Sequence, residues 1–188
     1  MNTHAPHNTT TARSLFAEVA LLPGGWQENV LLRWDETGDL CEVTSGATAP
    51  AGTPRAAGPV VSGMPNLHSH AFQRAMAGLT ETLGDPADSF WSWRTLMYRF
   101  AQRLLPHHLH AIGRHLYIEM LKAGYTSVCE FHYVHHGADG QPYDNPAELA
   151  EQIVRAGEEV GIGMTLLPVL YQYSGFGQSA PLAHQQRF

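Results

Sequence analysis

The fold is decided by the stretch PHHLHAIGRHLYIEMLKAGYTSVCEFHYV, which covers residues 106–134. Its first part has the start and stop signals of a helix, with Pro106 at the first position and Gly124 just past the end. Apolar residues recur on one helical face, at Leu109, Ile112, Leu116 and Met120. The following residues are rich in β-branched and aromatic side chains and predict a strand over 126–134. A helix followed directly by a strand is typical of a parallel α/β repeat.

The same pattern is repeated downstream. Asn145 as N-cap and Pro146 at the first helical position predict the start of a helix, with Glu148 as the capping-box partner. Gly161 predicts its end. Residues 162–170 are almost continuously apolar, which is typical of a strand in a sheet covered on both faces.

A third strand is predicted upstream, as a buried run within residues 58–67. Strands that alternate with helices predict an α/β fold with a parallel sheet or barrel. A closed eight-stranded barrel takes ~250 residues. We therefore expect residues 59–188 to hold the first three or so β/α units of an incomplete (β/α)8 barrel of the TIM type, which breaks off in the Gly- and Gln-containing stretch 175–188.

The N-terminal part has a different pattern. Residues 1–13 are polar and predict a disordered tail. Residues 14–58 predict a small β unit and a connector, because three short apolar stretches precede a segment rich in Ala, Gly, Pro and Thr. The apolar stretches are 15–22, 30–34 and 40–44, and the connector is 46–58.

Composition narrows the class of function. The chain has 188 residues, a formal net charge of -6 and one lysine, Lys122, so it offers no basic stripe for nucleic acid or an anionic membrane. Its two cysteines, Cys41 and Cys129, form no disulfide framework and no CxxC motif. Neither an export signal nor a membrane anchor is evident. We expect a cytoplasmic protein that acts on a small molecule.

The strongest motif is Asn66-Leu-His-Ser-His70, at the carboxyl end of the first expected barrel strand. Side chains alternate across a strand, so His68 and His70 point the same way and could hold one metal ion. A His-x-His pattern alone is weak evidence. Its position strengthens it, because barrel enzymes place their chemistry at the carboxyl ends of strands.

Longer strings carry a family resemblance. The string GMPNLHSHAFQRAMAGLT, residues 63–80, resembles the metal-binding signature of the amidohydrolase superfamily, and in detail that of the formimidoylglutamate deiminase family. The strings DSFWSWRTLMYRF (88–100), AGYTSVCEFHY (123–133) and LPVLYQYSGF (167–176) resemble the same family. The likeness extends from about Phe16 to Phe188 and is far more specific than His-x-His.

The resemblance implies a barrel of the metal-dependent hydrolase kind beside a small β-sandwich domain, to which residues 14–58 contribute. It implies one zinc ion, with His68 and His70 as two of four ligands. The family's other ligands and its proton-transferring residues come from later strands. The implied activity is hydrolytic deimination of N-formimino-L-glutamate in histidine degradation, with a homodimer as the full-length state and an inactive fragment when these residues stand alone.

Gln73 and Tyr133 match substrate-contacting positions of the family, and the planar fork of Arg94 could pair with a substrate carboxylate. Each also has a structural interpretation, since Gln73 could be a polar helix or loop residue, Tyr133 a core aromatic and Arg94 a packing residue in an aromatic helix. Glu130 and His132 alternate with Phe131 and Tyr133, and the sequence does not decide which pair faces the barrel interior. His135 and His136 are adjacent, so they face opposite sides of a continuing strand and more readily begin a loop.

Two other hypotheses stay open. One is a related deaminase of the same superfamily that acts on a cyclic amidine, such as a nucleobase. The other is a truncated, non-catalytic remnant, because two ligands do not complete the shell of a catalytic zinc site. Lys122 is not the lysine that bridges two metals in binuclear relatives, since it is expected on a helix rather than at a strand end.

Overall fold

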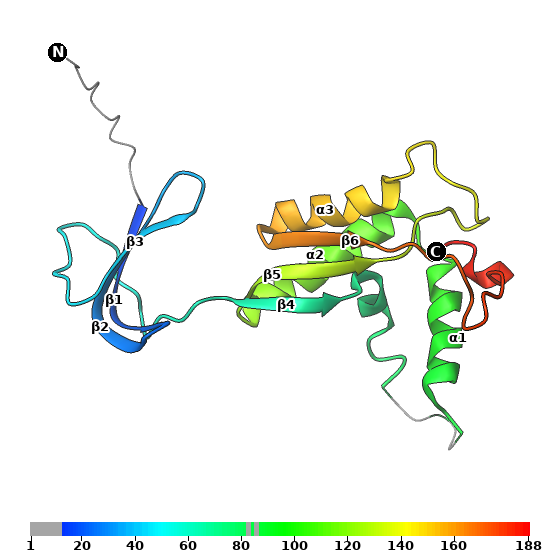
Figure 1. Cartoon of the computed structure of the whole chain (residues 1–188), viewed down its shortest axis with the longest axis horizontal. Helices are drawn as coiled ribbons and strands as arrows, with labels where there is room; N and C mark the ends of the chain where they lie inside the picture. The colour runs from blue at the N-terminus through cyan, green and yellow to red at the C-terminus, as the bar shows by residue number, and fades with distance from the viewer. Residues whose placement is uncertain (1–12, 82–83, 85–86) are drawn as a thin grey trace, which may run out of the picture. The chain divides into compact units, whose positions relative to one another are not determined.

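The computed structural model describes residues 13–81, 84 and 87–188. The chain divides between Ser62 and Gly63 into two compact units (Figure 1). Of the expected tail, residues 1–12 lie outside the described residues, and Arg13 is already the first residue of strand β1. In the described part of the chain, no helix is long and apolar enough to cross a membrane.

The N-terminal unit is an antiparallel sheet in the order β1-β2-β3. Its strands are β1 (Arg13–Leu22), β2 (Gly25–Trp34) and β3 (Leu40–Thr44), close to the three predicted apolar stretches. Ala17, Ala20 and Val30 form its small buried core. Gly25, with φ at 103°, makes the tight turn from β1 to β2.

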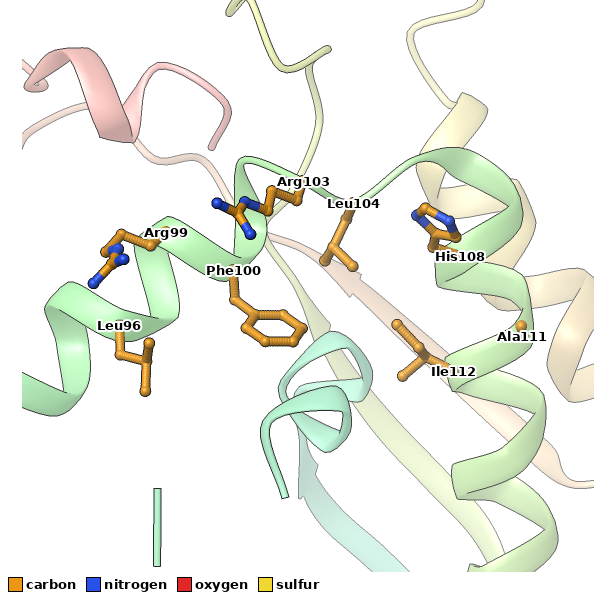
Figure 2. A pocket seen from close by; sticks show the side chains of 8 residues that line it. All are labelled: Leu96, Arg99, Phe100, Arg103, Leu104, His108, Ala111 and Ile112. Atoms are coloured by element: carbon orange, nitrogen blue, oxygen red, sulfur yellow. The ribbon is translucent and has the colours of Figure 1, made fainter. Parts of the chain in front are cut away.

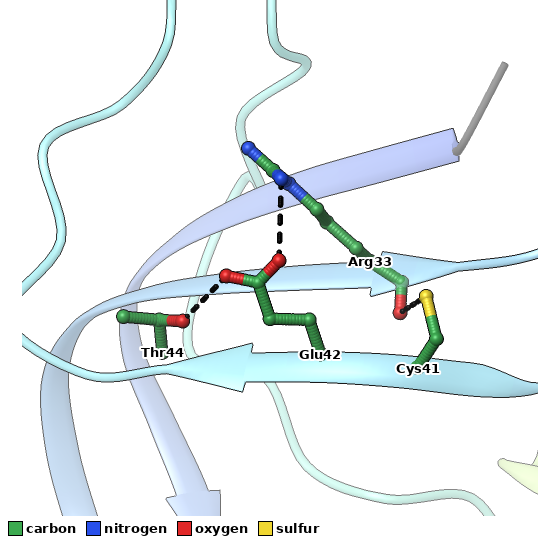
Figure 3. Close-up of polar contacts among 4 residues, drawn as sticks. All are labelled: Arg33, Cys41, Glu42 and Thr44. Atoms are coloured by element: carbon green, nitrogen blue, oxygen red, sulfur yellow. Dashed lines mark hydrogen bonds and ion pairs between the residues drawn. The ribbon is translucent and has the colours of Figure 1, made fainter. Parts of the chain in front are cut away.

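Polar contacts hold the β2–β3 pair on its exposed side (Figure 3). Arg33 and Glu42 are register partners, and Arg33 Nη1 lies 3.2 Å from Glu42 Oε2. The other carboxylate oxygen accepts the Thr44 hydroxyl at 2.8 Å. Both charged side chains are solvent-exposed, so this pair aligns the strands and adds little stability.

The C-terminal unit is a parallel α/β unit. Its sheet has the order β4-β5-β6, with β4 (Met64–Ser69), β5 (Tyr125–His132) and β6 (Gly163–Pro168). The longer helices are α1 (Phe90–Ala101), α2 (Pro106–Lys122) and α3 (Glu148–Val160), and the short 3-10 helices are η1 (Ala71–Met76) and η2 (Ala183–Gln185). Helices α2 and α3 pack on each other and against the sheet (Figure 1). The predicted α/β content is therefore confirmed.

The sequence explains why the two connecting helices pack so closely. Helix α2 begins at Pro106, as predicted. Gly113 removes a side chain where α3 approaches, since a Cβ there would lie 3.3 Å from Ile153 Cδ1 and 3.4 Å from Ala156 Cβ. Gly161 ends α3 in the left-handed region, with φ at 80°, as predicted.

The predicted start of α3 was wrong by two residues. The helix begins at Glu148 with Ala147 as N-cap, rather than after Asn145. The Asn145 side chain accepts from the Ala147 amide at 3.0 Å, and its carbonyl accepts from the Glu148 amide at 3.0 Å. Asn145 therefore closes a local turn before the helix, which is the usual competition between this side chain and helical hydrogen bonds.

The two outer strands are shorter and more exposed than predicted. The buried strand expected within 58–67 is instead β4, which starts at Met64 and has mostly exposed side chains. The strand expected over 162–170 is β6, whose side chains alternate between half-buried and exposed. The reason is that β4 and β6 are the edges of a three-stranded sheet whose helices α2 and α3 share one face. Leu67 and Leu170 are 72% and 85% exposed.

The C-terminal stretch 175–188 is part of the fold, although its composition gave no sign of this. Arg187 is 0% exposed. Its guanidinium donates to the carbonyl oxygens of Ala101, of Leu104 at 2.5 Å and of His136 at 2.9 Å. Arg187 thereby ties the end of α1 to the segment that follows β5.

We expect the 188-residue polypeptide, produced alone, to bind the dye ANS and to self-associate. The physical reason is that a parallel sheet with unpaired edges and exposed leucines offers both strand pairing and apolar contact. Size-exclusion chromatography and dye fluorescence test this. The variant Leu170→Gln should lower dye binding without lowering stability, because that side chain is already in solvent. A cooperatively melting monomer that binds no dye would contradict the expectation.

Candidate functional site

A cavity of about 540 Å³ lies at the carboxyl ends of the parallel strands. All five residues that the sequence singled out line it: His68, His70, Gln73, Arg94 and Tyr133. They come from β4, from η1, from α1 and from the residue directly after β5. The topology therefore collects side chains that are up to 65 positions apart in the sequence.

His68 and His70 form the polar end of this cavity. Their ring centroids are 4.8 Å apart with the planes nearly perpendicular, at 87°. His70 Nδ1 lies 3.1 Å from the Phe131 carbonyl oxygen. Because a carbonyl can only accept, this contact holds the proton on Nδ1 and leaves Nε2 with a free lone pair. Burial lowers the pKa of His70, aided by the neighbouring His68, so the neutral ligand form is favoured.

Both imidazoles fit a divalent metal such as zinc in chemical type, and His70 also fits in tautomer. In the described ranges, no group of three or more His, Cys, Asp or Glu side chains is arranged to hold a metal ion. Zinc sites in proteins use three or four protein ligands. The His68–His70 pair could therefore supply part of a metal shell whose other ligands come from elsewhere.

Gln73 and Tyr133 are joined across the cavity wall. Gln73 Nε2 donates to the Tyr133 hydroxyl oxygen at 2.7 Å. Burial raises the pKa of Tyr133 to about 12, and the Gln73 hydrogen bond offsets part of this rise. Tyr133 is thus a neutral phenol at physiological pH, with an O–H that can donate to a ligand.

Arg94 is held by a network that the sequence did not reveal. Its Nε donates to the Tyr98 hydroxyl at 2.7 Å, and an Nη donates to the Tyr171 hydroxyl at 3.1 Å. Gln185 Nε2 contacts the same two hydroxyls, at 3.0 and 3.1 Å. Tyr171 lies in one of the family-like strings, but no motif in the sequence identified Gln185. The network orients the guanidinium fork, and among the described residues no ion pair involves Arg94.

Glu130 and His132 face the helices, which answers the question that alternation left open. Glu130 accepts from Tyr117 on α2 and is 1% exposed. Burial raises its pKa. His132 is 4% exposed and its Nε2 has no hydrogen-bond partner. Phe131 and Tyr133 line the cavity instead.

His135 and His136 follow β5 in a loop, and both amides donate to the Arg187 carbonyl oxygen. Lys122 is the last residue of α2, as expected from the sequence. None of these three residues lines the cavity.

A second hollow, of about 460 Å³, lies between α1 and α2 (Figure 2). Leu96, Phe100, Leu104 and Ile112 give it an apolar lining, and Arg99, Arg103 and His108 lie at its margin (Figure 2). None of the five candidate metal- or substrate-binding residues lines it. The cavity around His68 and His70 is therefore the candidate site.

Comparison with known proteins shows what the chain as a whole resembles. Residues 12–57 match the family model described as formimidoylglutamate deiminase HutF, N-terminal domain. The chain is 57% identical over 175 residues to formimidoylglutamate deiminase of Pseudomonas aeruginosa. That alignment covers 93% of this chain and 38% of the relative. The chain therefore spans well under half the length of this curated relative.

Solved structures give the same picture of the fold. The crystal structure of an amidohydrolase from Brucella melitensis matches with a TM-score of 0.87 and 48% identity, over 94% of this chain and 39% of that one. Atrazine chlorohydrolase TrzN from Arthrobacter aurescens TC1, complexed with zinc, matches with a TM-score of 0.58 and 15% identity, over 82% and 35%. At that low identity, the second likeness concerns the fold alone.

The buried His132 predicts a pH-dependent stability. Burial lowers its pKa to about 4 from 6.5. Below pH 6.5 His132 becomes protonated in the unfolded chain, whereas in the folded state it stays neutral down to about pH 4. Folding stability should therefore fall over this window by roughly 3 kcal/mol, at about 1.4 kcal/mol per pKa unit. Urea unfolding at pH 7 and pH 4 measures this loss.

His132→Leu should reduce the acid-induced loss of folding stability, because it removes the buried imidazole that is protonated more readily in the unfolded chain. His107→Gln is the matched control, since that side chain is exposed at the start of α2. An unchanged pH dependence in His132→Leu would show that His132 is not buried in the neutral form.

Proposed function

We propose that this chain, which corresponds to the N-terminal part of an amidohydrolase-superfamily protein, contributes to the active site of a zinc-dependent formimidoylglutamate deiminase. The reaction is hydrolysis of N-formimino-L-glutamate to N-formyl-L-glutamate and ammonia, in histidine degradation. The convergence of His68, His70, Gln73, Arg94 and Tyr133 in one cavity carries the proposal. Identity of 57% with a curated deiminase of that name supports it.

The proposal includes the finer fold assignment. Strands β4, β5 and β6 with their helices are the first three β/α units of a (β/α)8 barrel, within residues 59–188, and residues 14–58 belong to a small β-sandwich domain. Support comes from the packing of α2 on α3, which puts both helices on one face of the sheet. A doubly wound sheet carries helices on both faces, whereas a barrel carries them only outside.

His68 and His70 would hold the zinc ion, a single one, together with ligands from the rest of the longer protein. When bound, zinc lowers the pKa of a coordinated water to about 7 and so supplies the nucleophile for hydrolysis. The Arthrobacter enzyme, described with zinc, supports a metal in this fold. The contribution of the present residues is an imidazole pair in which the Phe131 carbonyl oxygen orients the His70 ring.

Gln73, Arg94 and Tyr133 would bind the substrate. Arg94 presents a planar fork that matches a carboxylate, and its tyrosine partners keep it aimed at the cavity. The Tyr133 phenol donates a hydrogen bond, and the Gln73 carbonyl oxygen accepts one. Hydrolysis adds the water oxygen to the formimino carbon and releases its terminal nitrogen as ammonia. The protons for this step are moved by groups outside the chain described here.

The alternatives are weaker on specific grounds. A deaminase of a cyclic amidine remains the second candidate, but an unpaired arginine beside Gln73 and Tyr133 favours an acyclic dicarboxylate. The third candidate, a non-catalytic remnant, describes these 188 residues when they stand alone, because two histidines do not complete a zinc site. We place the full-length enzyme in the cytoplasm, where its free Cys41 and Cys129 would stay reduced, as a homodimer.

The first test reads the DNA downstream of the Phe188 codon. We expect an open frame that encodes a histidine, a glutamate, a second histidine and an aspartate at the ends of later strands. The protein from that frame should release ammonia from N-formimino-L-glutamate and not from guanine or adenine. A stop codon directly after Phe188 would favour the remnant, and turnover of a nucleobase would favour the second candidate.

The second test concerns the substrate carboxylate. In the full-length protein, Arg94→Met should raise KM for N-formimino-L-glutamate by about 10- to 100-fold, the worth of ~1.5–3 kcal/mol for hydrogen bonds to a charged group. His115→Asn, on the exposed side of α2, is the matched control and should leave KM unchanged. Thermal melting of both variants checks that the fold is kept. An unaltered KM in Arg94→Met would remove Arg94 from the binding site.

A further inference from the structure

Glu130 is a buried acid that the proposed reaction does not use. It lies on β5 and is fully enclosed. Within the described ranges, it forms no ion pair. A carboxyl group buried without a cationic partner is costly unless it is well hydrogen-bonded. The partners that it has therefore indicate what it does.

Those partners come from three separate elements. The Ala71 amide donates to Glu130 Oε1 at 2.5 Å, at the start of η1. The Tyr117 hydroxyl donates to Oε2 at 3.2 Å, from α2. The Ser69 side chain, at the end of β4, is a third hydrogen-bond partner. Two of the three partners are the residues immediately before and after His70.

The strand pairing explains why this position needs side-chain support. The parallel ladder between β4 and β5 is irregular between Asn66 and Ser69, where the His68 segment lies. The His68 amide donates a hydrogen bond to the Asn66 side-chain oxygen at 3.1 Å. The Ala71 amide turns to Glu130. Side chains thus replace regular ladder hydrogen bonds on both sides of the histidine pair.

Glu130 and its neighbour on β5 hold His70 from two directions. The Phe131 carbonyl fixes the imidazole ring through Nδ1. Glu130 holds the Ala71 amide directly after the same residue and the Ser69 side chain directly before it. We propose that Glu130 is a positioning residue, which locks the Ser69–Ala71 backbone so that the His70 ring presents Nε2 to the metal. This inference rests on the proposed function for the identity of the metal site.

The test uses the full-length protein and the variant Glu130→Gln, which keeps the volume but replaces one acceptor oxygen by a donor. Zinc affinity of the metal-free protein, measured by competition with a chromophoric chelator, should fall about 10- to 100-fold, as is usual when a group supporting a metal ligand is removed. Hydrogen exchange at the Ala71 amide should become faster, because the neutral amide oxygen of glutamine is a weaker acceptor than a carboxylate oxygen.

Two controls separate positioning from stability. His132→Gln changes another buried polar residue on β5 that also faces the helices, and it should alter thermal melting without altering zinc affinity. Tyr117→Phe removes only the helix-side partner of Glu130, so the Ala71 contact and the zinc affinity should be kept.

The outcomes distinguish this inference from the proposed function. If Glu130→Gln binds zinc as tightly as the wild type, or leaves Ala71 exchange unchanged, Glu130 does not position His70. If the wild type binds no zinc but Glu130→Gln still accelerates Ala71 exchange, the metal assignment fails and the positioning contact stands. A fall in zinc affinity equal to that in His132→Gln would reduce the role of Glu130 to general stability.

Discussion

The parallel pairing of β4 with β5 is the constraint on which the candidate site depends. It places Ser69 opposite Glu130, so the His68–His70 segment runs beside Phe131 and Tyr133. The contacts that define the site follow from this register: the His70 ring to the Phe131 carbonyl, Gln73 to Tyr133 and the Ala71 amide to Glu130. A slip by one residue would turn these side chains to the opposite face of the sheet.

The other half of the cavity depends on the C-terminal segment. Helix α1 carries Arg94 and is not part of the β/α repeat, so the sheet alone does not position it. Arg187 bonds to carbonyl oxygens at the end of α1, and Gln185 bonds to the tyrosine hydroxyls that hold Arg94. Residues 185–187 thus connect α1 to the strand ends, and the short 3-10 helix η2 has a clear structural purpose.

Local signals predicted most of the fold. Proline and glycine punctuation gave the ends of α2 and the end of α3, because those positions depend on the backbone of one residue. The exposure of β4 and β6 was not predictable in the same way. An apolar run has the same sequence pattern whether its strand lies in the middle of a sheet or at its edge. The side of the sheet that Glu130 faces, and the role of Gln185, depend on contacts more than ten positions away in sequence. Of the five candidate residues, Gln73 and Tyr133 were predicted from family-like strings and Arg94 from its planar guanidinium, whereas spacing alone gave only the histidine pair.

The distribution of buried polar groups gives a physical reason to link the fold with chemistry. Among the described residues, the buried polar side chains are Ser69, Glu130, His132, Gln185 and Arg187. All of them lie at the carboxyl end of β4 or β5 or in the C-terminal segment that supports Arg94. Apart from Glu130 and His132, the core under α2 and α3 is built from apolar side chains. Burying polar groups lowers stability unless each is satisfied, so a fold selected for stability alone would not concentrate them around one cavity. Their concentration there indicates that the unit gives up stability to hold a few side chains in fixed orientations, which is what a binding or catalytic site requires.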